Sequence, residues 1–404
     1  MQTSLNHDVL SGVSFLTGSA GIAQALPDVP ALMPFDDKIV EFLNDVSKDL
    51  LSNSRSKAFS DVVTFAFWIR KASVLKLKER FQLKDGALHL GRGVVFHIAP
   101  SNVPVNFAYS LVSGLLNGNA NVVRVPSKSF EQVQILADAF NNALARHEWM
   151  KPYVLLVRYG RDKAVNDLFS SWADVRVIWG GDATIAELRT SPLPPRSGEI
   201  TFADRYSLAV IDADSYLATE NKGKVALDFY NDTFFTDQNA CTSPRIIVWT
   251  GSAIGEAKKI FWEEEHRLVE KKYTFQSIQG VNKLTNSCLL AAADPGVKVE
   301  RHEDNLIVRV AVPEITDHLM DYKGNCGYFF EYDCSDILDI KKICNDKRCQ
   351  TIAYIGDGKA VLPLIMSGVK GIDRVVPMGK TMDFDLIWDG YNLPALLTRT
   401  VVMA

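Results

Sequence analysis

The pattern of hydrophobic and polar positions predicts helices at the start of the chain. From residue 36 onward, apolar side chains recur every three or four positions, which is the period of an amphipathic helix. Two helices are predicted, one beginning at residue 36 and one over 58–81. Residues 1–35 carry few periodic signals and include three prolines, so this part is predicted to be an irregular arm.

Short apolar runs then alternate with helical segments. The predicted strands are 93–98, 121–125, 154–157 and 175–179, and the predicted helices between them are 107–116, 129–146 and 161–171. Strands that alternate with helices are typical of a parallel sheet covered by helices. The predicted fold class of this half is therefore α/β.

A proline-rich stretch at 191–196 ends the first series, and a second series of strands begins at residue 207. Its predicted strands are 207–211, 246–249, 306–312, 351–355 and 398–402, and its predicted helices are 253–273 and 357–368. The chain has 404 residues, which is too long for one ordinary core. Two α/β domains are therefore predicted.

Composition narrows the function classes. The net charge of −4 provides no basic field for nucleic acid, so DNA or RNA is not an expected partner. Six cysteines in a chain of this length do not indicate a disulfide framework. No signal peptide and no apolar run of about 18 residues is recognisable, so we expect no membrane span and a reducing, cytoplasmic location.

One cysteine lies in a setting that suits a nucleophile. Cys241 is surrounded by small and polar residues in the segment 237–245, and a strand-like run follows. A structural cysteine usually lies within an apolar run, whereas a thiol in a loop can be reached by a ligand. By itself this makes Cys241 a candidate only.

Three strand-to-helix turns carry polar or flexible residues where ligands bind in parallel α/β sheets. Asn102 follows the strand 93–98, and its amide can donate to an oxyanion; alternatively it is a turn or N-cap residue. Arg124 ends the next strand, where its positive charge would bind a phosphate or ribose; alternatively it is a solvated edge residue. Gly180, Gly181 and Asp182 follow the strand 175–179, where glycines allow a pyrophosphate to approach a helix N-terminus. A single glycine pair is weak evidence.

Taken together, these segments resemble the aldehyde dehydrogenase superfamily, and most closely the acyl-CoA reductase family of bacterial luminescence. Ala99–Pro104 is similar to a proline-x-asparagine-x-proline segment, and Asn117–Ser127 to a strand and cofactor-binding turn. Asp237–Arg245 is similar to the nucleophile loop. The segments Ile372–Gly379 and Trp388–Gly390 resemble the reductase branch.

The resemblance implies two parallel-sheet α/β domains with the active site in the cleft between them. The first, 1–205, would hold N-terminal helices and a Rossmann-like cofactor domain, and 206–375 would be the catalytic domain. Residues 376–404 would return to the cofactor domain or an oligomer interface. The implied nucleophile is Cys241, and the implied oxyanion donor is Asn102. The residues expected to bind cofactor are Ala99, Pro100, Ser101, Arg124, Ser127, Lys128, Gly180, Gly181 and Asp182.

Two departures from the superfamily pattern refine the expected reaction. Aldehyde-oxidising relatives have a water-activating glutamate where Phe202 stands, although Asp204 would restore a carboxylate in a shifted alignment. NAD-preferring relatives often place a glutamate where Ser127 and Lys128 stand, and these two residues tolerate a 2′-phosphate. We therefore expect NADPH-dependent reduction of an acyl thioester to an aldehyde. The alternatives are an aldehyde-oxidising dehydrogenase and a catalytically silent acyl-binding subunit.

Several further expectations follow. The acyl donor is coenzyme A or a protein, and the family implies an acyl-protein synthetase partner. The strand 398–402 suggests a homo-oligomer, because superfamily members pair through a C-terminal strand. His97 is interpreted as a core or sheet-edge histidine, so the base that ionises Cys241 stays unassigned. The cysteines at 326, 334, 344 and 349 lack the spacing of a zinc site, so no metal is expected.

Overall fold

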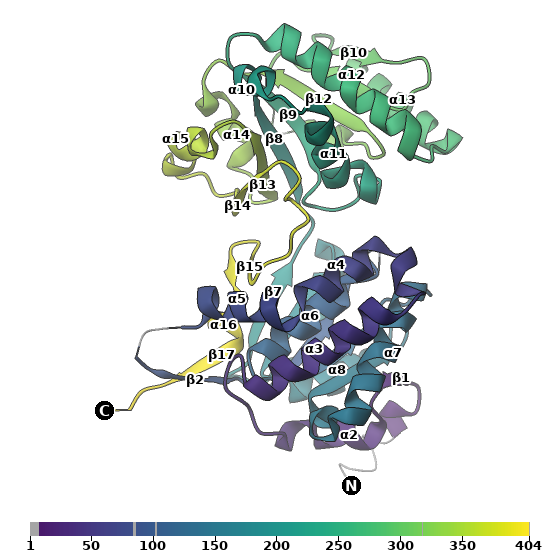
Figure 1. Ribbon diagram of the computed structural model, residues 1–404, viewed down its shortest axis with the longest axis vertical. Coiled ribbons are helices and arrows are strands. Elements are labelled where there is room, and N and C mark those ends of the chain that lie inside the picture. Colours follow the sequence, from purple (N-terminus) through teal and green to yellow (C-terminus); the bar gives the residue numbers. More distant parts are fainter. Residues whose placement is uncertain (1–7, 84–85, 102, 317, 404) are drawn as a thin grey trace. The chain divides into compact units, whose positions relative to one another are not determined.

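A computed structural model describes residues 8–83, 86–101, 103–316 and 318–403 (Figure 1). The chain divides into two compact units, which are treated separately below. Unit 1 comprises residues 1–203 and 384–404, and unit 2 comprises 204–383. The sequence placed the corresponding boundaries at 205/206 and 375/376.

Unit 1 is built on a six-stranded sheet in the order β1-β5-β4-β3-β6-β7. Five strands run parallel: β3 to β6, as the alternating pattern predicted, and β7, which was not predicted; only β1 is antiparallel to its neighbour. The bounds are β1 Ser14–Thr17, β3 Val94–Ile98, β4 Ala120–Arg124, β5 Val154–Arg158, β6 Val175–Trp179 and β7 Gly198–Phe202. The connecting helices are α6 Asn106–Leu116, α7 Glu131–Arg146, α8 Lys163–Trp172 and α9 Asp182–Leu188.

The prediction of an irregular N-terminal arm is wrong. Residues 14–17 form β1, which pairs with β5, and α2 (Ala20–Ala25) follows. The Asn141 side chain of α7 donates to the Leu16 carbonyl at 2.9 Å and ties the strand to the unit. A four-residue edge strand shows no measurable period by itself, so only its pairing with β5 defines it.

The single helix predicted over 58–81 is two helices, α4 (Ser60–Trp68) and α5 (Lys71–Phe81). Arg70 between them is extended, with φ −62° and ψ 147°. The Asn44 side chain of α3 (Asp37–Ser52) accepts from the Lys71 amide at 3.1 Å. A long-range hydrogen bond of this kind satisfies a donor at the start of the second helix, which local periodicity cannot reveal.

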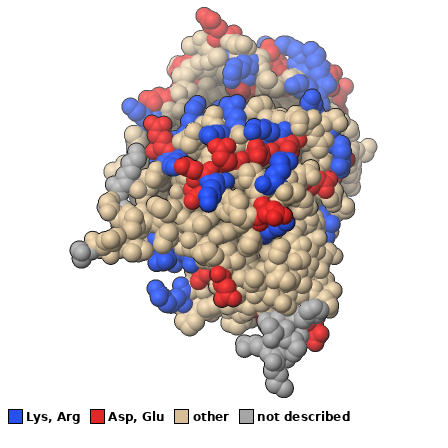
Figure 2. All heavy atoms as spheres, turned by 60° about the horizontal axis from the view of Figure 1, so that its bottom comes forward, with Lys and Arg blue, Asp and Glu red and all other residues tan. Residues whose placement is uncertain are grey.

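Acidic and basic side chains are interspersed on the face of the molecule shown in Figure 2. Ion pairs join neighbouring elements of unit 1: Arg146 of α7 to Asp49 of α3 at 2.6 Å, and Arg55 to Glu131 at 3.2 Å. Exposed pairs of this kind each contribute roughly 0–1 kcal/mol. The buried side chains of these helices are the main source of their stability.

The last segment of the chain belongs to unit 1. Trp388, Leu393 and Leu397 are buried against β6 and β7. After α16 (Leu393–Leu397), β17 (Thr398–Val401) pairs antiparallel with β2 (Leu88–Gly91) in a separate two-stranded sheet. The strand expected near 398–402 is therefore present, and its partner lies within the same chain.

Unit 2 is built on a seven-stranded sheet in the order β10-β11-β12-β9-β8-β13-β14. Only β10 is antiparallel to its neighbour. The bounds are β8 Tyr206–Asp212, β9 Pro244–Thr250, β10 Lys298–Arg301, β11 Val308–Ala311, β12 Tyr328–Asp333, β13 Cys349–Ile355 and β14 Arg374–Pro377. Alternate residues of β8 enter different cores, Leu208 and Val210 on one face, and Ala209 and Ile211 on the other.

Helices α10 (Ala213–Ala218), α11 (Lys222–Asp232) and α12 (Ile254–Lys272) cover one face of this sheet, and α13 (Ser277–Ala293), α14 (Lys341–Cys344) and α15 (Leu362–Met366) contribute to the other. Of these, α10, α11, α13 and α14 were not predicted. The buried side of α13 is formed by Lys283, Ser287 and Leu290, whereas Ile278 and Val281 are exposed. This inverted pattern explains why periodicity missed the helix. No helix in the described part of the chain is long and apolar enough to cross a membrane.

Helix α12 contains a buried carboxyl, Glu265, which is 0% exposed. Neither of its oxygens has a hydrogen-bond partner among the described residues, and burial raises its pKa well above the ordinary value. Above the unfolded-state pKa of about 4.3, the folded protein therefore binds more protons than the unfolded chain. The free energy of unfolding therefore falls as the pH rises from about 4.3 toward the pKa that Glu265 has in the folded protein.

Replacing Glu265 with glutamine is therefore expected to remove a pH-dependent loss of stability. The difference in Tm between Glu265→Gln and the wild type should grow in favour of the variant from pH 5 to pH 9. Glu263→Gln, an exposed position on the same helix, serves as the control for the loss of one charge. Parallel curves for Glu265→Gln and the wild type would contradict the buried-acid interpretation.

Candidate functional site

In unit 1, the turns that follow three of the predicted strands lie at the same edge of the sheet. The strands β4, β3 and β6 are neighbours and parallel, so the segments after residues 98, 124 and 179 leave one edge of the sheet. The chain order reverses between β3 and β6, which is where open α/β sheets bind ligands. Ala99 and Pro100 are half-buried there, and Ser101 is exposed. The predicted oxyanion donor Asn102 lies outside the described residues.

Arg124 is half-buried at the end of β4. Its Nη2 donates to the Gly160 carbonyl at 2.9 Å, and its guanidinium lies 4.6 Å from the centre of the Tyr159 ring. These contacts fix the side chain and keep its charge near the edge of the sheet. Ser127 and Lys128 follow in the next turn and are exposed, so their side chains are accessible to a ligand.

The turn after β6 leaves its backbone accessible. A Cβ added at Gly181 would meet no atom within 4 Å, whereas one added at Gly180 would press on Thr184 at 3.2 Å. Gly181 is the N-cap of α9, and Asp182 is an exposed acid in the first turn of that helix. The geometry thus provides an open backbone approach, and the role of Asp182 in cofactor binding stays a prediction.

Phe202, at the position of the absent glutamate, is buried at the end of β7. Its ring stacks on Trp179 with centroids 3.6 Å apart and planes 14° apart, and Tyr391 packs against its edge. Asp204, the other residue considered at this place, is exposed and accepts from Lys323 at 3.4 Å. Stacked aromatic rings therefore occupy the end of β7.

His97 is a core residue, as interpreted from the sequence. It is 1% exposed, with Nδ1 2.7 Å from Ser110 Oγ and Nε2 3.0 Å from Asn121 Oδ1. Trp179 Nε1 donates to the same serine oxygen at 2.9 Å. Burial lowers the pKa of His97 to about 4, so the ring is neutral at pH 7. A neutral ring with hydrogen bonds at both nitrogens suits a structural role.

In unit 2, Cys241 is half-buried and lies just before β9. Its carbonyl accepts from Ser207 Oγ on β8 at 2.8 Å. The next residue, Thr242, is buried, and its hydroxyl lies 3.2 Å from Met382 Sδ. The thiol is therefore presented at the beginning of a central strand by a backbone that neighbouring elements hold in place.

Gln238 anchors the loop that carries Cys241. It is fully buried, has a left-handed backbone with φ 56°, and uses its whole amide. Its Nε2 donates to the carbonyls of Pro244 and Tyr328, each at 3.0 Å. Its Oε1 accepts from the amides of Gly327 and Tyr328 at 3.1 and 3.2 Å. One side chain thus joins the loop to the start of β12, a role that the sequence did not reveal.

Arg245 on β9 is also buried and contacts the same loop. Its Nη2 donates to the Gln238 carbonyl at 2.8 Å, and its Nη1 donates to Gly324 O and Asn325 Oδ1, each at 2.5 Å. Cys326 lies next to this contact, because its amide donates to the Asp237 carbonyl at 3.1 Å. Cys326 is distant from the loop in the sequence, whereas Arg245 is the last residue of the segment 237–245. The contacts of both residues are visible only in the fold.

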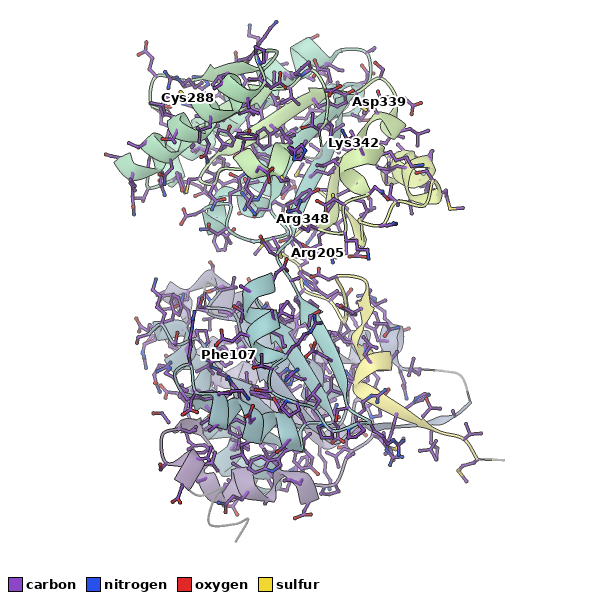
Figure 3. The ribbon with its side chains drawn as sticks, turned by 180° about the vertical axis from the view of Figure 1, so that it is seen from behind. Phe107, Arg205, Cys288, Asp339, Lys342 and Arg348 are labelled. Carbon is purple, nitrogen blue, oxygen red and sulfur yellow. The ribbon has the colours of Figure 1, made fainter. Side chains whose placement is uncertain are left out.

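None of the six cysteines is in a disulfide. Cys344 and Cys349 are buried in the core of unit 2, and Cys288 is exposed on α13 (Figure 3). Burial raises the pKa of Cys334 to about 11. Within the described ranges, no group of three or more His, Cys, Asp or Glu side chains is arranged to hold a metal ion.

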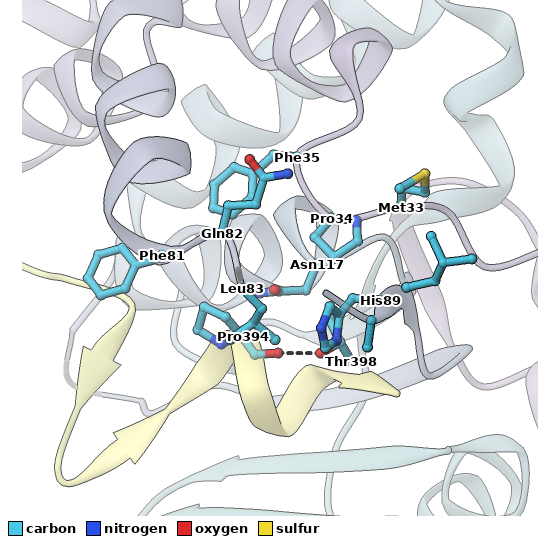
Figure 4. Close-up of a pocket in the computed structure, with 12 residues that line it drawn as sticks. Met33, Pro34, Phe35, Phe81, Gln82, Leu83, His89, Asn117, Pro394 and Thr398 are labelled. Carbon is cyan, nitrogen blue, oxygen red and sulfur yellow. Dashed lines mark hydrogen bonds between the residues drawn. The ribbon is translucent and has the colours of Figure 1, made fainter. Parts of the chain in front are cut away.

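A small pocket in unit 1 lies apart from the predicted site residues (Figure 4). It is bounded by the segment before α3, the end of α5, β2 and the C-terminal segment, and includes Phe35, Phe81, His89, Asn117 and Thr398. The Thr398 hydroxyl donates to the Pro394 carbonyl at 2.6 Å inside it. None of the residues predicted to bind cofactor or substrate lines this pocket.

Comparison with known proteins gives a family for most of the chain. The model of the family described as acyl-CoA reductase (LuxC) matches residues 77–399. Curated relatives include a long-chain acyl-protein thioester reductase from Photorhabdus luminescens, 24% identical over 294 residues, and one from Aliivibrio fischeri, 21% identical over 294 residues. Each match covers 71% of this chain and 58% of the relative, so the chain spans less than two thirds of their length.

Solved structures confirm the predicted fold class. Aldehyde dehydrogenase 21 from Physcomitrella patens, in complex with succinate, matches with a TM-score of 0.68 at 12% identity, over 95% of this chain and 89% of that chain. An indole-3-acetaldehyde dehydrogenase from P. syringae, in complex with NAD+, matches with a TM-score of 0.66 at 11% identity, over 95% and 86%. At such identities the likeness concerns the fold alone, which is aldehyde-dehydrogenase-like.

Proposed function

Since the chain belongs to the acyl-CoA reductase (LuxC) family, we propose that it reduces a fatty acyl thioester to an aldehyde with NADPH, through an S-acyl intermediate on Cys241. The observation that carries the proposal is the family match over residues 77–399, which includes the loop presenting Cys241. The curated relatives are named as acyl-protein thioester reductases. We extend that activity to this chain, with an acyl-CoA or an acyl-protein as donor.

The proposed chemistry begins with the Cys241 thiolate, which attacks the thioester carbonyl carbon. The resulting oxyanion is held by the Asn102 amide, and one such donor is typically worth about 10²–10³ in rate. The bond from carbon to the donor sulfur breaks, the donor thiolate leaves and takes up a proton, and the acyl group stays on Cys241. Reduction gives a thiohemiacetal, whose carbon–sulfur bond to Cys241 then breaks to release the aldehyde.

The strand ends of unit 1 fit a dinucleotide. The backbone at Gly181 after β6 is open, and Arg124 is fixed at the end of β4, with β3 between these two strands. Ser127 and Lys128 are exposed. We propose that the glycine turn takes the pyrophosphate and that Lys128 takes the 2′-phosphate. NADPH bound there supplies the hydride for the reduction.

Release of an aldehyde rather than an acid is supported by the end of β7. A hydrolytic enzyme of this fold class needs a carboxylate that activates water. Phe202 is buried against Trp179, and Asp204 is exposed and bound to Lys323. With no carboxylate supplied by Phe202, the S-acyl group on Cys241 would persist until it is reduced.

The intermediate gives a direct test. The purified chain, mixed with acyl-CoAs of different lengths and no nucleotide, is expected to gain one acyl mass, mapped to the Cys241 peptide. Addition of NADPH should remove that mass, release the aldehyde and consume the nucleotide in equal amounts. Release of free acid without nucleotide would favour a hydrolytic enzyme. A chain that never gains an acyl mass from any donor would be a non-catalytic subunit.

Reversing the charge at Lys128 tests the nucleotide preference. Lys128→Glu is expected to weaken NADPH binding by roughly 1–2 kcal/mol, or about 5–30-fold, with a much smaller effect on NADH. The reason is that an added carboxylate repels the 2′-phosphate, which NADH lacks. Fluorescence titration with both nucleotides measures the effect, and Lys57→Glu at an exposed site on η2 (Ser56–Ala58) is the control. Equal weakening for both nucleotides would contradict the assignment.

Association is also proposed. Because β17 and β2 form a sheet of two strands, each retains an edge that no described strand covers. Leu88 and Val402 at that sheet are exposed by 46% and 80%. We propose that a homo-oligomer forms through this sheet, and that an acyl-protein synthetase is the partner that delivers the acyl group.

A further inference from the structure

Arg245 is a buried cation with neutral hydrogen-bond partners. It is 5% exposed, and its two terminal nitrogens donate to the Gln238 and Gly324 carbonyls and to the Asn325 side-chain oxygen. Its Nε is buried and finds no hydrogen-bond partner among the described residues. No carboxylate in the described part of the chain forms an ion pair with it. A buried guanidinium without a counter-ion is costly, and arginine stays protonated in proteins.

The Arg245 guanidinium is held against the loop of Cys241, because it donates to the carbonyl of Gln238 in that loop at 2.8 Å. Burial lowers the pKa of Arg245, and three ionisable groups oppose that effect: Asp204, Cys241 and Cys326. Asp204 is exposed, so solvent screens it, and it already binds Lys323. It therefore provides little of the missing negative charge.

Cys326 does not provide that charge either. Burial is the largest influence on its thiol and raises its pKa above the ordinary value, although Tyr273, Lys283 and Arg245 act in the opposite direction. The thiol therefore stays protonated at neutral pH. This leaves Cys241 as the group whose ionised form would pair with the guanidinium.

We propose that Arg245 is the positioning residue that holds the Cys241 thiol in its ionised, nucleophilic form. The inference deepens the proposed function, on which it rests for the role of the thiol. No adjacent base is required, because the thiol proton passes to solvent and the thiolate remains beside the cation. The half-buried setting of Cys241 limits solvent screening, so the attraction is stronger than it would be on the surface.

Other charged groups near the loop act on different partners. Lys283 is 1% exposed and donates to the Leu306 and Cys326 carbonyls at 2.9 and 2.8 Å. The ionisable groups that influence it are Cys326 and Asp304. On the other side, the Asp237 carboxylate accepts from the Tyr273 hydroxyl at 2.6 Å. Lys283 is therefore a matched buried cation of the same unit whose hydrogen bonds go to the Leu306 and Cys326 carbonyls and not to the segment 237–245.

The pH dependence of thiol alkylation tests this inference. The full-length protein is labelled with iodoacetamide between pH 5 and pH 10, and mass spectrometry follows the Cys241 and Cys288 peptides separately. In the wild type, the midpoint for Cys241 is expected at least one pH unit below that for the exposed Cys288, since a cation at close range lowers a thiol pKa by roughly 1–3 units. A midpoint for Cys241 equal to or above that of Cys288 would overturn the inference without any variant.

Variants then identify the cation. Arg245→Gln should raise the Cys241 midpoint by one unit or more and slow labelling at pH 7 about tenfold. Arg245→Lys should retain most of the effect, and Lys283→Met should leave the Cys241 midpoint in place. An unchanged midpoint in a folded Arg245→Gln, checked by circular dichroism, would overturn the assignment. Should that variant not fold, the wild-type midpoint and Arg245→Lys decide, and a midpoint at or above that of Cys288 in Arg245→Lys counts against it.

Labelling requires neither acyl donor nor nucleotide, so the two proposals fail separately. A low Cys241 midpoint that rises in Arg245→Gln, combined with full reductase activity of Cys241→Ala, would contradict the proposed function and leave the effect of Arg245 intact. Loss of activity in Cys241→Ala, combined with an ordinary Cys241 midpoint in the wild type, would support the proposed function and contradict the effect of Arg245.

Discussion

Replacing Cys241 with alanine is expected to abolish aldehyde formation, with a loss of about 10³-fold or more in kcat, because the acyl group then has no sulfur to bind. Neither Thr242 nor Ser243 offers a substitute, since both side chains are buried. The same variant should gain no acyl mass from any acyl-CoA, while nucleotide binding to unit 1 should be unchanged. Activity is measured as consumption of NADPH in the presence of an acyl-CoA, and acylation is measured by intact mass.

The matched control is Cys288→Ala, which removes an exposed thiol from α13 in the same unit (Figure 3). It should keep both the activity and the acyl mass on Cys241. Full activity of Cys241→Ala would show that the nucleophile has been assigned to the wrong residue.

Replacing Gln238 with alanine is expected to cost roughly 3–5 kcal/mol in the free energy of unfolding of unit 2. The change removes four buried hydrogen bonds, two donated to the carbonyls of Pro244 and Tyr328 and two accepted from the amides of Gly327 and Tyr328. Each unsatisfied buried group costs about 1–3 kcal/mol, and local relaxation recovers part of that sum. Urea unfolding followed by circular dichroism measures the loss.

Activity should fall together with stability in Gln238→Ala, because the loop that presents Cys241 loses its attachment to β12. Asn239→Ala, at the exposed neighbouring position, is the control and should cost less than about 1 kcal/mol. A Gln238→Ala protein as stable as Asn239→Ala would show that the loop is held by other contacts.

The sequence predicted eight of the eleven parallel strands, because most of these are buried apolar runs with a clear end, but it did not predict β7, β12 and β14. It predicted the turns after β3, β4 and β6, and the strand order of the sheet, β4-β3-β6, makes these three strands neighbours. It failed where an element depends on contacts far along the chain. The strand β1 exists through its pairing with β5, and α13 buries Lys283 because two carbonyls accept from that ammonium group.

The same distinction applies to the candidate site. Cys241 was found from its polar loop, and the family resemblance gave it a role that stays a proposal. Gln238 and Arg245 lie within the same motif, yet their importance depends on Tyr328, Gly324 and other partners about 80–90 residues away. No local pattern encodes such partners, because hydrogen bonds between distant segments form only when the strands are already placed.

The sequence by itself determined the class of fold, the family and the candidate nucleophile, since each depends on local runs of residues and short motifs. Only the tertiary structure showed that Phe202 stacks on Trp179, that burial keeps the His97 ring neutral, and that a buried guanidinium lies against the loop of Cys241. The physical reason is burial. Desolvation and long-range hydrogen bonds set the charge and the orientation of a side chain, and neither is determined before the two sheets have formed.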